Sequence, residues 1–201
     1  AFLYPIAEAQ YSLFNDLFIP YVSISGGVHQ QRFETFTRTN EFIRSNVHLE
    51  NLQRLQMRFG MKGTLSKKMS FNVGAQVANN RNFALFINDT IFSAGNQFNV
   101  IYDTVTVTSL QGSLSYQWNE KIKVDGILTL FNYQLNNNPY AWNLPTAAAT
   151  LRGKYNMYDR LILHIDFTVE TGRRARVFNS TIPNITNDDG ILSVPLGLLV
   201  D

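Results

Sequence analysis

The chain contains no cysteine, and this absence excludes disulfide bonds and thiolate metal ligands. Charge is scarce as well, since Asp, Glu, Lys and Arg make up 16% of the 201 residues, against about 25% in ordinary soluble domains. No run of about 18 apolar residues, the length of a transmembrane helix, is present. The sequence also begins without the cationic segment of a signal peptide. Its 45% of hydrophobic residues must therefore follow another pattern.

Residue patterns that carry chemistry are missing too. The three histidines, His29, His48 and His164, lie in separate segments, and no glycine-rich phosphate loop or metalloprotease pair occurs. We therefore expect no catalytic residue, no metal, no cofactor and no enzymatic activity. The net charge of +2 comes from scattered Lys and Arg, so binding to nucleic acid is not expected either.

What is present is a strict alternation of apolar and polar residues, clearest between residues 146 and 170. Leu161, Leu163, Ile165 and Phe167 alternate there with polar residues such as His164. Side chains of a strand alternate with a period of two, so this pattern predicts a β-hairpin with one apolar and one mostly polar face. Pairing Tyr155 with Leu161 would set Arg152 opposite His164 and Thr150 opposite Asp166.

The same unit recurs along the chain. Hairpins are expected over about residues 6–31, 53–79, 99–135 and 146–170, with the start of a further strand at 191–201, all within one unit of 1–201. Connections are short and polar within each hairpin, and long and rich in Asn and Thr between hairpins. Residues 83–87, an apolar run without clear alternation, fall in one long connection, and the upstream half of the third hairpin is expected to project beyond the sheet.

These features predict an all-β fold, an antiparallel up-and-down meander of about eight to nine strands in the wall of a transmembrane outer-membrane barrel. Such barrels combine short turns at one end, long loops at the other and an apolar outer band with aromatic girdles. A soluble all-β module that encloses a hydrophobic ligand also alternates, but its apolar face points inward, and parity alone leaves both possibilities open.

In the barrel interpretation each face has its own environment. The residues expected to face lipid are Phe59, Phe71, Trp118, Tyr155, Leu163 and Phe167. The polar residues expected to face the lumen are Arg54, Arg58, Lys62, Lys123, Arg152, Lys154, His164, Asp166 and Glu170. We interpret the closely spaced His164 and Asp166 as part of this interior polar network rather than as a proton relay or metal pair. Outer-membrane lipid is the expected surrounding, and Arg173, Arg174 and Arg176 are candidates for contact with lipopolysaccharide phosphates.

Several phrases in the chain give it a family resemblance. Thr39-Asn40-Glu41-Phe42-Ile43, Phe59-Gly60-Met61-Lys62-Gly63 and Tyr140-Ala141-Trp142-Asn143-Leu144-Pro145 are among them, as are Phe2–Tyr11, Leu49-Glu50-Asn51, Leu151–Tyr155 and Val194–Gly197. In these the chain resembles TonB-dependent-receptor-like outer-membrane β-barrel proteins. The resemblance implies a barrel of about 22 strands with a plugged lumen, of which this chain is a late segment without the plug domain.

The function implied is uptake of a substrate or capture of a ligand, through the polar lumen and the long extracellular loops, at the cell outer membrane of a Gram-negative bacterium. The transported ligand is not specified by the sequence. A structural barrel within an outer-membrane complex is a third possibility.

Overall fold

The computed structural model describes residues 4–89, 96–157, 161–177, 190–193 and 197–200, with side chains up to residue 175. It contains eleven named strands and one short helix in this part of the chain. In chain order they are β1 (Ile6–Gln10), β2 (Ile19–His29), α1 (Phe33–Thr39), β3 (Leu52–Ser66), β4 (Met69–Asn88), β5 (Phe98–Gln117), β6 (Ile122–Leu135), β7 (Ala147–Met157), β8 (Leu161–Thr171), β9 (Arg174–Val177), β10 (Gly190–Ser193) and β11 (Gly197–Val200).

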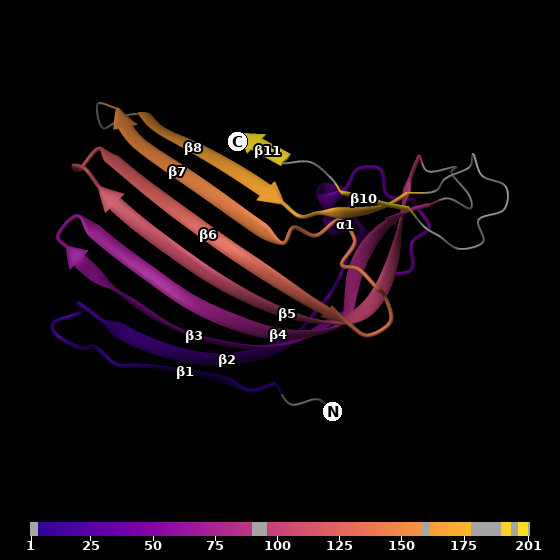
Figure 1. Cartoon of the computed structure of the whole chain (residues 1–201), viewed down its shortest axis with the longest axis horizontal. Helices are drawn as coiled ribbons and strands as arrows, with labels where there is room; N and C mark the ends of the chain where they lie inside the picture. Colours follow the sequence, from indigo (N-terminus) through magenta and orange to yellow (C-terminus); the bar gives the residue numbers. More distant parts are fainter. Residues whose placement is uncertain (1–3, 90–95, 158–160, 178–189, 194–196, 201) are drawn as a thin grey trace.

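Nine strands form one curved antiparallel sheet in the order β1-β2-β3-β4-β5-β6-β7-β8-β11 (Figure 1). Each strand from β1 to β8 pairs with the next along the chain, so the predicted all-β up-and-down meander is confirmed. The short turns lie together at one end of the sheet, and the long connections lie at the other (Figure 1). We call these the turn end and the loop end. The remaining strands, β9 and β10, pair as a separate two-stranded sheet at the loop end.

The pairing preserves the predicted faces of the sheet. In the third hairpin Leu114 pairs with Gly126 and Gly112 with Leu128, as the size alternation predicted. In the fourth hairpin the predicted register is wrong by two residues, because Tyr155 pairs with Leu163 and Arg152 with Asp166. A shift of two residues leaves every side chain on its own face, so alternation could not distinguish the two registers.

Strands β4 and β5 extend beyond the neighbouring strands and curl away from the sheet as a ribbon (Figure 1). The projection of β5 was expected, but the sequence prediction ended β4 near Asn79 and treated residues 83–87 as a loop. They are strand, pairing with residues 99–103. The register shifts between Asn80 and Phe83, where Asn82 has a φ of 57°. This β-bulge places one additional residue on β4 and changes which face each later side chain occupies.

Two further elements were missed in the long connections. Residues 30–51 contain the seven-residue helix α1, and residues 171–190 contain β9 and the start of β10. A helix this short gains little from propensity and depends on packing for stability. Phe36 of α1 supplies that packing, because it is 5% exposed and meets the ring of Phe86 on β4 edge to face, with 5.6 Å between centroids.

The apolar core therefore lies at the loop end, outside the sheet proper. Phe36, Ile43 and Val100 form its buried centre, and the partly buried side chains around it are Phe33, Val47, Ala84, Phe86, Phe98 and Tyr102. In the described part of the chain, no helix is long and apolar enough to cross a membrane.

Candidate functional site

One face of the sheet is apolar and lies open. Side chains of every second residue of β3 to β8 form this apolar face, and several of them are among the most exposed hydrophobic residues of the chain. Phe59 on β3 is 50% exposed, Leu151 on β7 is 54% exposed and Ile165 on β8 is 59% exposed. Apolar residues of a soluble domain are normally buried, so a continuous exposed surface of this kind marks a binding surface for lipid or protein.

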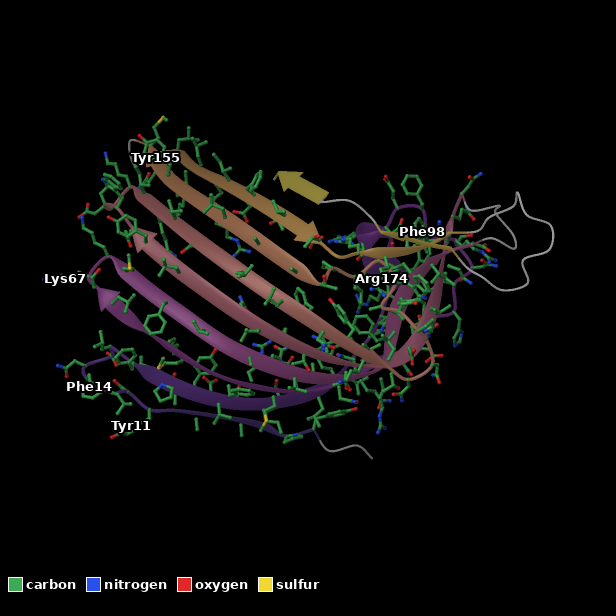
Figure 2. All side chains as sticks on the ribbon, viewed as in Figure 1. Tyr11, Phe14, Lys67, Phe98, Tyr155 and Arg174 are labelled. Atoms are coloured by element: carbon green, nitrogen blue, oxygen red, sulfur yellow. The ribbon has the colours of Figure 1, made fainter. Side chains whose placement is uncertain are left out.

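The six residues predicted to face lipid all lie on this apolar face. Phe59, Trp118, Tyr155, Leu163 and Phe167 are exposed, whereas Phe71 is partly covered by the ring of Phe18, 6.1 Å away between centroids. Tyr155 lies at the turn end together with Tyr11, Phe14 and Lys67 (Figure 2). Trp118, just beyond the end of β5, meets the ring of Tyr116 edge to face at 6.3 Å. Aromatic side chains thus collect where the apolar face ends.

The apolar face also has a defined limit at the loop end. At this end, polar but uncharged residues follow the last apolar residues of the face. Asn79 of β4 lies opposite Leu55 and Thr106, and Thr108 of β5 lies opposite Asn132. From Leu55 to Leu65, β3 covers about 33 Å at about 3.3 Å per residue. A strand tilt of about 40° reduces this to about 25 Å, which is the height of the apolar band in outer-membrane barrels.

The opposite, polar face carries cross-strand hydrogen bonds. On β3, Arg54 Nε donates to Asn80 Oδ1 at 2.8 Å, and Arg58 Nε donates to Gln76 Oε1 at 2.6 Å. Thr150 and Thr168 on β7 and β8 lie within hydrogen-bond distance, with 3.0 Å between their hydroxyl oxygens. These bonds join side chains of adjacent strands and hold the polar face in one arrangement.

The nine residues predicted to line a lumen all lie on this polar face, in two groups. Arg54, Arg58 and Lys62 lie on β3, and the other six lie on β6 to β8. In the second group, Lys123 Nζ is 3.1 Å from Asp125 Oδ1, and Arg152 Nε is 3.2 Å from Asp166 Oδ2. His164 lies opposite Lys154, and Glu170 is ion-paired with Arg173.

The pairing of Asp166 with Arg152 bears on the proton-relay or metal interpretation of His164 and Asp166. Asp166 has its cationic partner on β7, and the residue opposite His164 is Lys154, which is no ligand for a cation. Among the described residues, no three His, Cys, Asp or Glu side chains gather as a metal site.

The three arginines near the loop end occupy different surroundings. The guanidinium of Arg173 is hydrogen-bonded within the chain, because its Nη1 donates to Asn143 O at 2.7 Å and its Nε donates to Glu170 Oε2 at 3.1 Å. Arg174 is exposed and stacks over the ring of Tyr140, 4.9 Å from the centroid, at the loop end seen in Figure 2. The side chain of Arg176 lies outside the described residues.

The sequence prediction missed a buried carboxylate at the loop end. Asp103, 3% exposed, accepts hydrogen bonds from the backbone N–H groups of Thr104, Asn137 and Asn138 and from both Asn side chains, between 2.7 and 3.2 Å. Burial alone would raise the pKa of Asp103, but these donors outweigh it and hold that pKa below its ordinary value. Asp103 thereby fastens the loop after β6 to the projecting ribbon. Its signal in the sequence was a single charged residue in an otherwise uncharged strand.

A second tie connects the ribbon to the segment after α1. The Tyr102 hydroxyl donates to His48 O at 2.8 Å and accepts from Glu50 N–H at 3.3 Å. Burial raises the pKa of Tyr102, so its hydroxyl stays protonated and able to donate over the ordinary pH range. Phe131, Tyr133, Tyr140, Leu144 and Arg174 line a nearby recess at this end. The loop end is therefore a packed structure that is held by hydrogen bonds and lined in part by aromatic side chains.

No protein-family model and no curated protein matches the chain. Several solved structures are similar to it. The pyoverdine outer membrane receptor FpvA from Pseudomonas aeruginosa PAO1, bound to pyoverdine, is similar over 98% of this chain, with a TM-score of 0.59 and 14% identity. FpvAI in its complex with pyocin S2 is similar over 98%, with a TM-score of 0.60 and 15% identity. The copper transporter OprC is similar over 82%, with a TM-score of 0.51 and 13% identity.

The chain spans 28%, 25% and 25% of the FpvA, FpvAI and OprC chains respectively. At such low identities the similarity establishes the fold and nothing further. The chain shares its antiparallel up-and-down strand arrangement with part of each of these proteins.

Proposed function

We propose that the chain is a wall segment of an outer-membrane, TonB-dependent-receptor-like barrel that takes up a substrate or captures a ligand. Its apolar face contacts lipid, its polar face lines the lumen, and its loop end is extracellular. The observation that carries this proposal is the exposed apolar face. At the strand tilt of about 40° typical of outer-membrane barrels, its extent on β3 corresponds to the apolar band of about 25 Å in such barrels. The chain performs no chemistry of its own in this role.

The polar face supports the same assignment. A soluble exterior is usually rich in Lys and Glu, whereas Ser, Gln, Asn and Thr predominate here, tied by cross-strand bonds such as the one from Gln56 Nε2 to Ser25 Oγ at 2.9 Å. A water-filled lumen accepts such a surface without an apolar partner. We extend the proposal to a location in the outer membrane of a Gram-negative bacterium, within a longer barrel.

The loop end supplies the surface for capture. Its ribbon, α1 and the loop after β6 form a preorganised platform, on which Arg174 is exposed and stacks on the partly buried ring of Tyr140. We propose lipopolysaccharide phosphates as the partner of Arg174, with Arg176 adding to this contact. Arg173 contributes by holding Glu170 and Asn143 in place.

The test is insertion into lipid. The longer barrel that contains this chain, diluted from urea into vesicles of a short-chain phosphatidylcholine, is expected to fold and float with the vesicles. The strands of this chain should then be protected from added protease, whereas its loop end should remain accessible. Folding to a monodisperse protein without lipid or detergent would contradict the proposal and favour a soluble module that encloses a hydrophobic ligand.

A further inference from the structure

Three cations form a row along the polar face of β3. Arg54, Arg58 and Lys62 follow one another at intervals of four residues, all with the same parity as the polar face. At about 3.3 Å per residue, neighbours in this cation row are separated by about 13 Å along the strand. The row extends from the loop end toward the turn end, over most of the height of the apolar band on the other face.

The partners of this cation row are amides rather than carboxylates. Asn80, Gln76 and Asn72 of β4 lie opposite Arg54, Arg58 and Lys62 in the register. Asn80 and Gln76 accept from the Nε atoms of the two arginines. Among the described residues, no carboxylate lies within ion-pair distance of any of the three cations. Each arginine is thus oriented by a neutral acceptor, which leaves its charge uncompensated and its Nη groups available.

The contrast with the other half of the same face is sharp. On β6 to β8, Lys123, Arg152 and Lys154 are accompanied by Asp125, Asp166 and Glu170, and two close ion pairs form. On β1 to β5, the described polar face carries two carboxylates, Glu8 of the edge strand and Asp103 in the projecting part of β5, where Asn137 and Asn138 hold it. The first half therefore carries an excess of positive charge, whereas the second half is balanced.

The cation row borders a polar recess of about 360 Å³. Arg58 and Lys62 contribute two positive charges and Glu8 one negative charge, so the recess is net cationic, and Tyr21, Ser23, Gln76 and Gln111 contribute hydrogen-bonding groups. Lys62 Nζ lies 5.9 Å from the centroid of the Tyr21 ring, and the Tyr21 hydroxyl donates to Asn72 Oδ1 at 3.0 Å. A guanidinium with free Nη groups beside an ammonium suits a small ligand with several anionic oxygens.

We propose that the cation row is an anion-binding track of the polar face, and that Arg58 and Lys62 bind small polyanions bearing phosphate or carboxylate groups. The proposal deepens the proposed function and rests on it, since only in a lumen does this face remain in contact with water inside the membrane.

The experiment uses the full chain folded in dodecyl maltoside micelles, with inorganic pyrophosphate as the probe and its ³¹P line width as the readout. We expect saturable binding that weakens as salt screens the charges. Arg58→Gln keeps a partner for Gln76 but removes the charge, and we expect it to weaken binding by about tenfold, the cost of one charge-assisted hydrogen bond. Arg58→Lys should restore part of the affinity.

Arg152→Gln is the matched control, because it removes an ion-paired arginine from the same face. We expect it to change the affinity by less than about twofold, the effect of a charge screened by its own partner. Equal losses in Arg58→Gln and Arg152→Gln, equally tight binding of the dication putrescine, or no binding to folded wild type would each overturn the proposal. Binding of a glutamate oligopeptide without binding of either pyrophosphate or citrate would overturn it in favour of an acidic polypeptide partner. Failure to insert into vesicles would instead refute the wall assignment, independently of this titration.

Discussion

Arg152 and Asp166 face each other across β7 and β8, with Arg152 Nε 3.2 Å from Asp166 Oδ2 and about half of each side chain exposed. This pair identifies the register of the hairpin but adds little to its stability. Removing it should cost no more than about 1 kcal/mol, because water screens an exposed ion pair. A double-mutant cycle with Arg152→Ala and Asp166→Ala, followed by urea unfolding in micelles, measures the coupling. A coupling well above that value would mean that the pair is far less accessible to water than the structure indicates.

Leu163 and its neighbour His164 test the assignment of the two faces. Leu163→Arg places a charge on the apolar face, and near the bilayer midplane it should reduce the free energy of unfolding by about 2–4 kcal/mol. His164→Arg places the same side chain on the polar face and should leave the free energy of unfolding within about 0.5 kcal/mol of wild type. Urea titrations in phosphatidylcholine vesicles give both values. Equal effects of the two substitutions would refute lipid contact at Leu163.

Asp103 should make the stability of the loop end depend on pH. Asp103→Asn removes the charge-assisted hydrogen bonds from Asn137 and Asn138, and we expect a loss of about 1.5–3 kcal/mol at neutral pH.

The sign of the pH effect follows from the lowered pKa of Asp103. Its stabilising contribution is complete above the ordinary value of 3.8 and is lost as the pH falls from there through the folded-state pKa. The difference in unfolding free energy between wild type and Asp103→Asn should therefore shrink only below about pH 4. Urea titrations at a series of pH values test this, and a difference that is constant down to pH 2 would contradict it.

Phe36 should control the docking of α1. Phe36→Ala empties the buried position against Phe86, and the cost of such a truncation is about 3–5 kcal/mol in a core. Because α1 is short, we expect this cost to appear as local release, with faster amide hydrogen exchange in residues 33–43 and unchanged exchange in β6 to β8. Phe42→Ala is the control, since the Phe42 side chain is 59% exposed. Equal exchange in both variants would show that Phe36 does not anchor the helix.

Arg174 is the residue with which the proposed lipopolysaccharide contact is tested. Arg174→Gln should weaken binding of the folded chain to lipopolysaccharide-containing vesicles several-fold, because one bidentate phosphate contact is lost. Arg173→Gln should act mainly on stability, since Arg173 is tied to Glu170 and Asn143. Co-sedimentation with vesicles with and without lipopolysaccharide separates the two effects. If Arg174→Gln binds as wild type does, lipopolysaccharide is not its partner.

Strands that face two different environments were predictable from the sequence. Residues 163–170 alternate without interruption because one face is apolar and the other polar, and the structure contains β8 over 161–171. The ribbon was harder to predict because both of its faces are covered. Leu85 is 1% exposed and Phe86 packs on Phe36, so apolar residues occupy both parities and the alternation disappears. Helix α1 depends on this tertiary contact, which has no local signature.

The register of the fourth hairpin was missed for a different reason. Alternation determines only whether a residue belongs to the odd or the even set, so registers that differ by two are equivalent by that criterion. Complementary side chains distinguish them: the observed register places Arg152 beside Asp166 and Thr150 beside Thr168. Charge pairing across candidate strands would have selected it.

The bulge between Asn80 and Phe83 divides β4 into two parts in which odd-numbered residues lie on opposite faces. Before it, odd-numbered residues such as Val77 belong to the apolar face of the sheet; after it, odd-numbered Leu85 and Ile87 are buried beside the ribbon on the opposite side. A scan of charged substitutions along β4 should therefore be intolerant at odd positions below Asn80, which contact lipid in the proposed barrel. Above the bulge it should be intolerant at both parities, because Leu85 and Phe86 are packed on opposite faces. Deleting Asn82 would remove the additional residue and leave Phe83 opposite Asp103, so the residues on either side of the bulge would keep their faces.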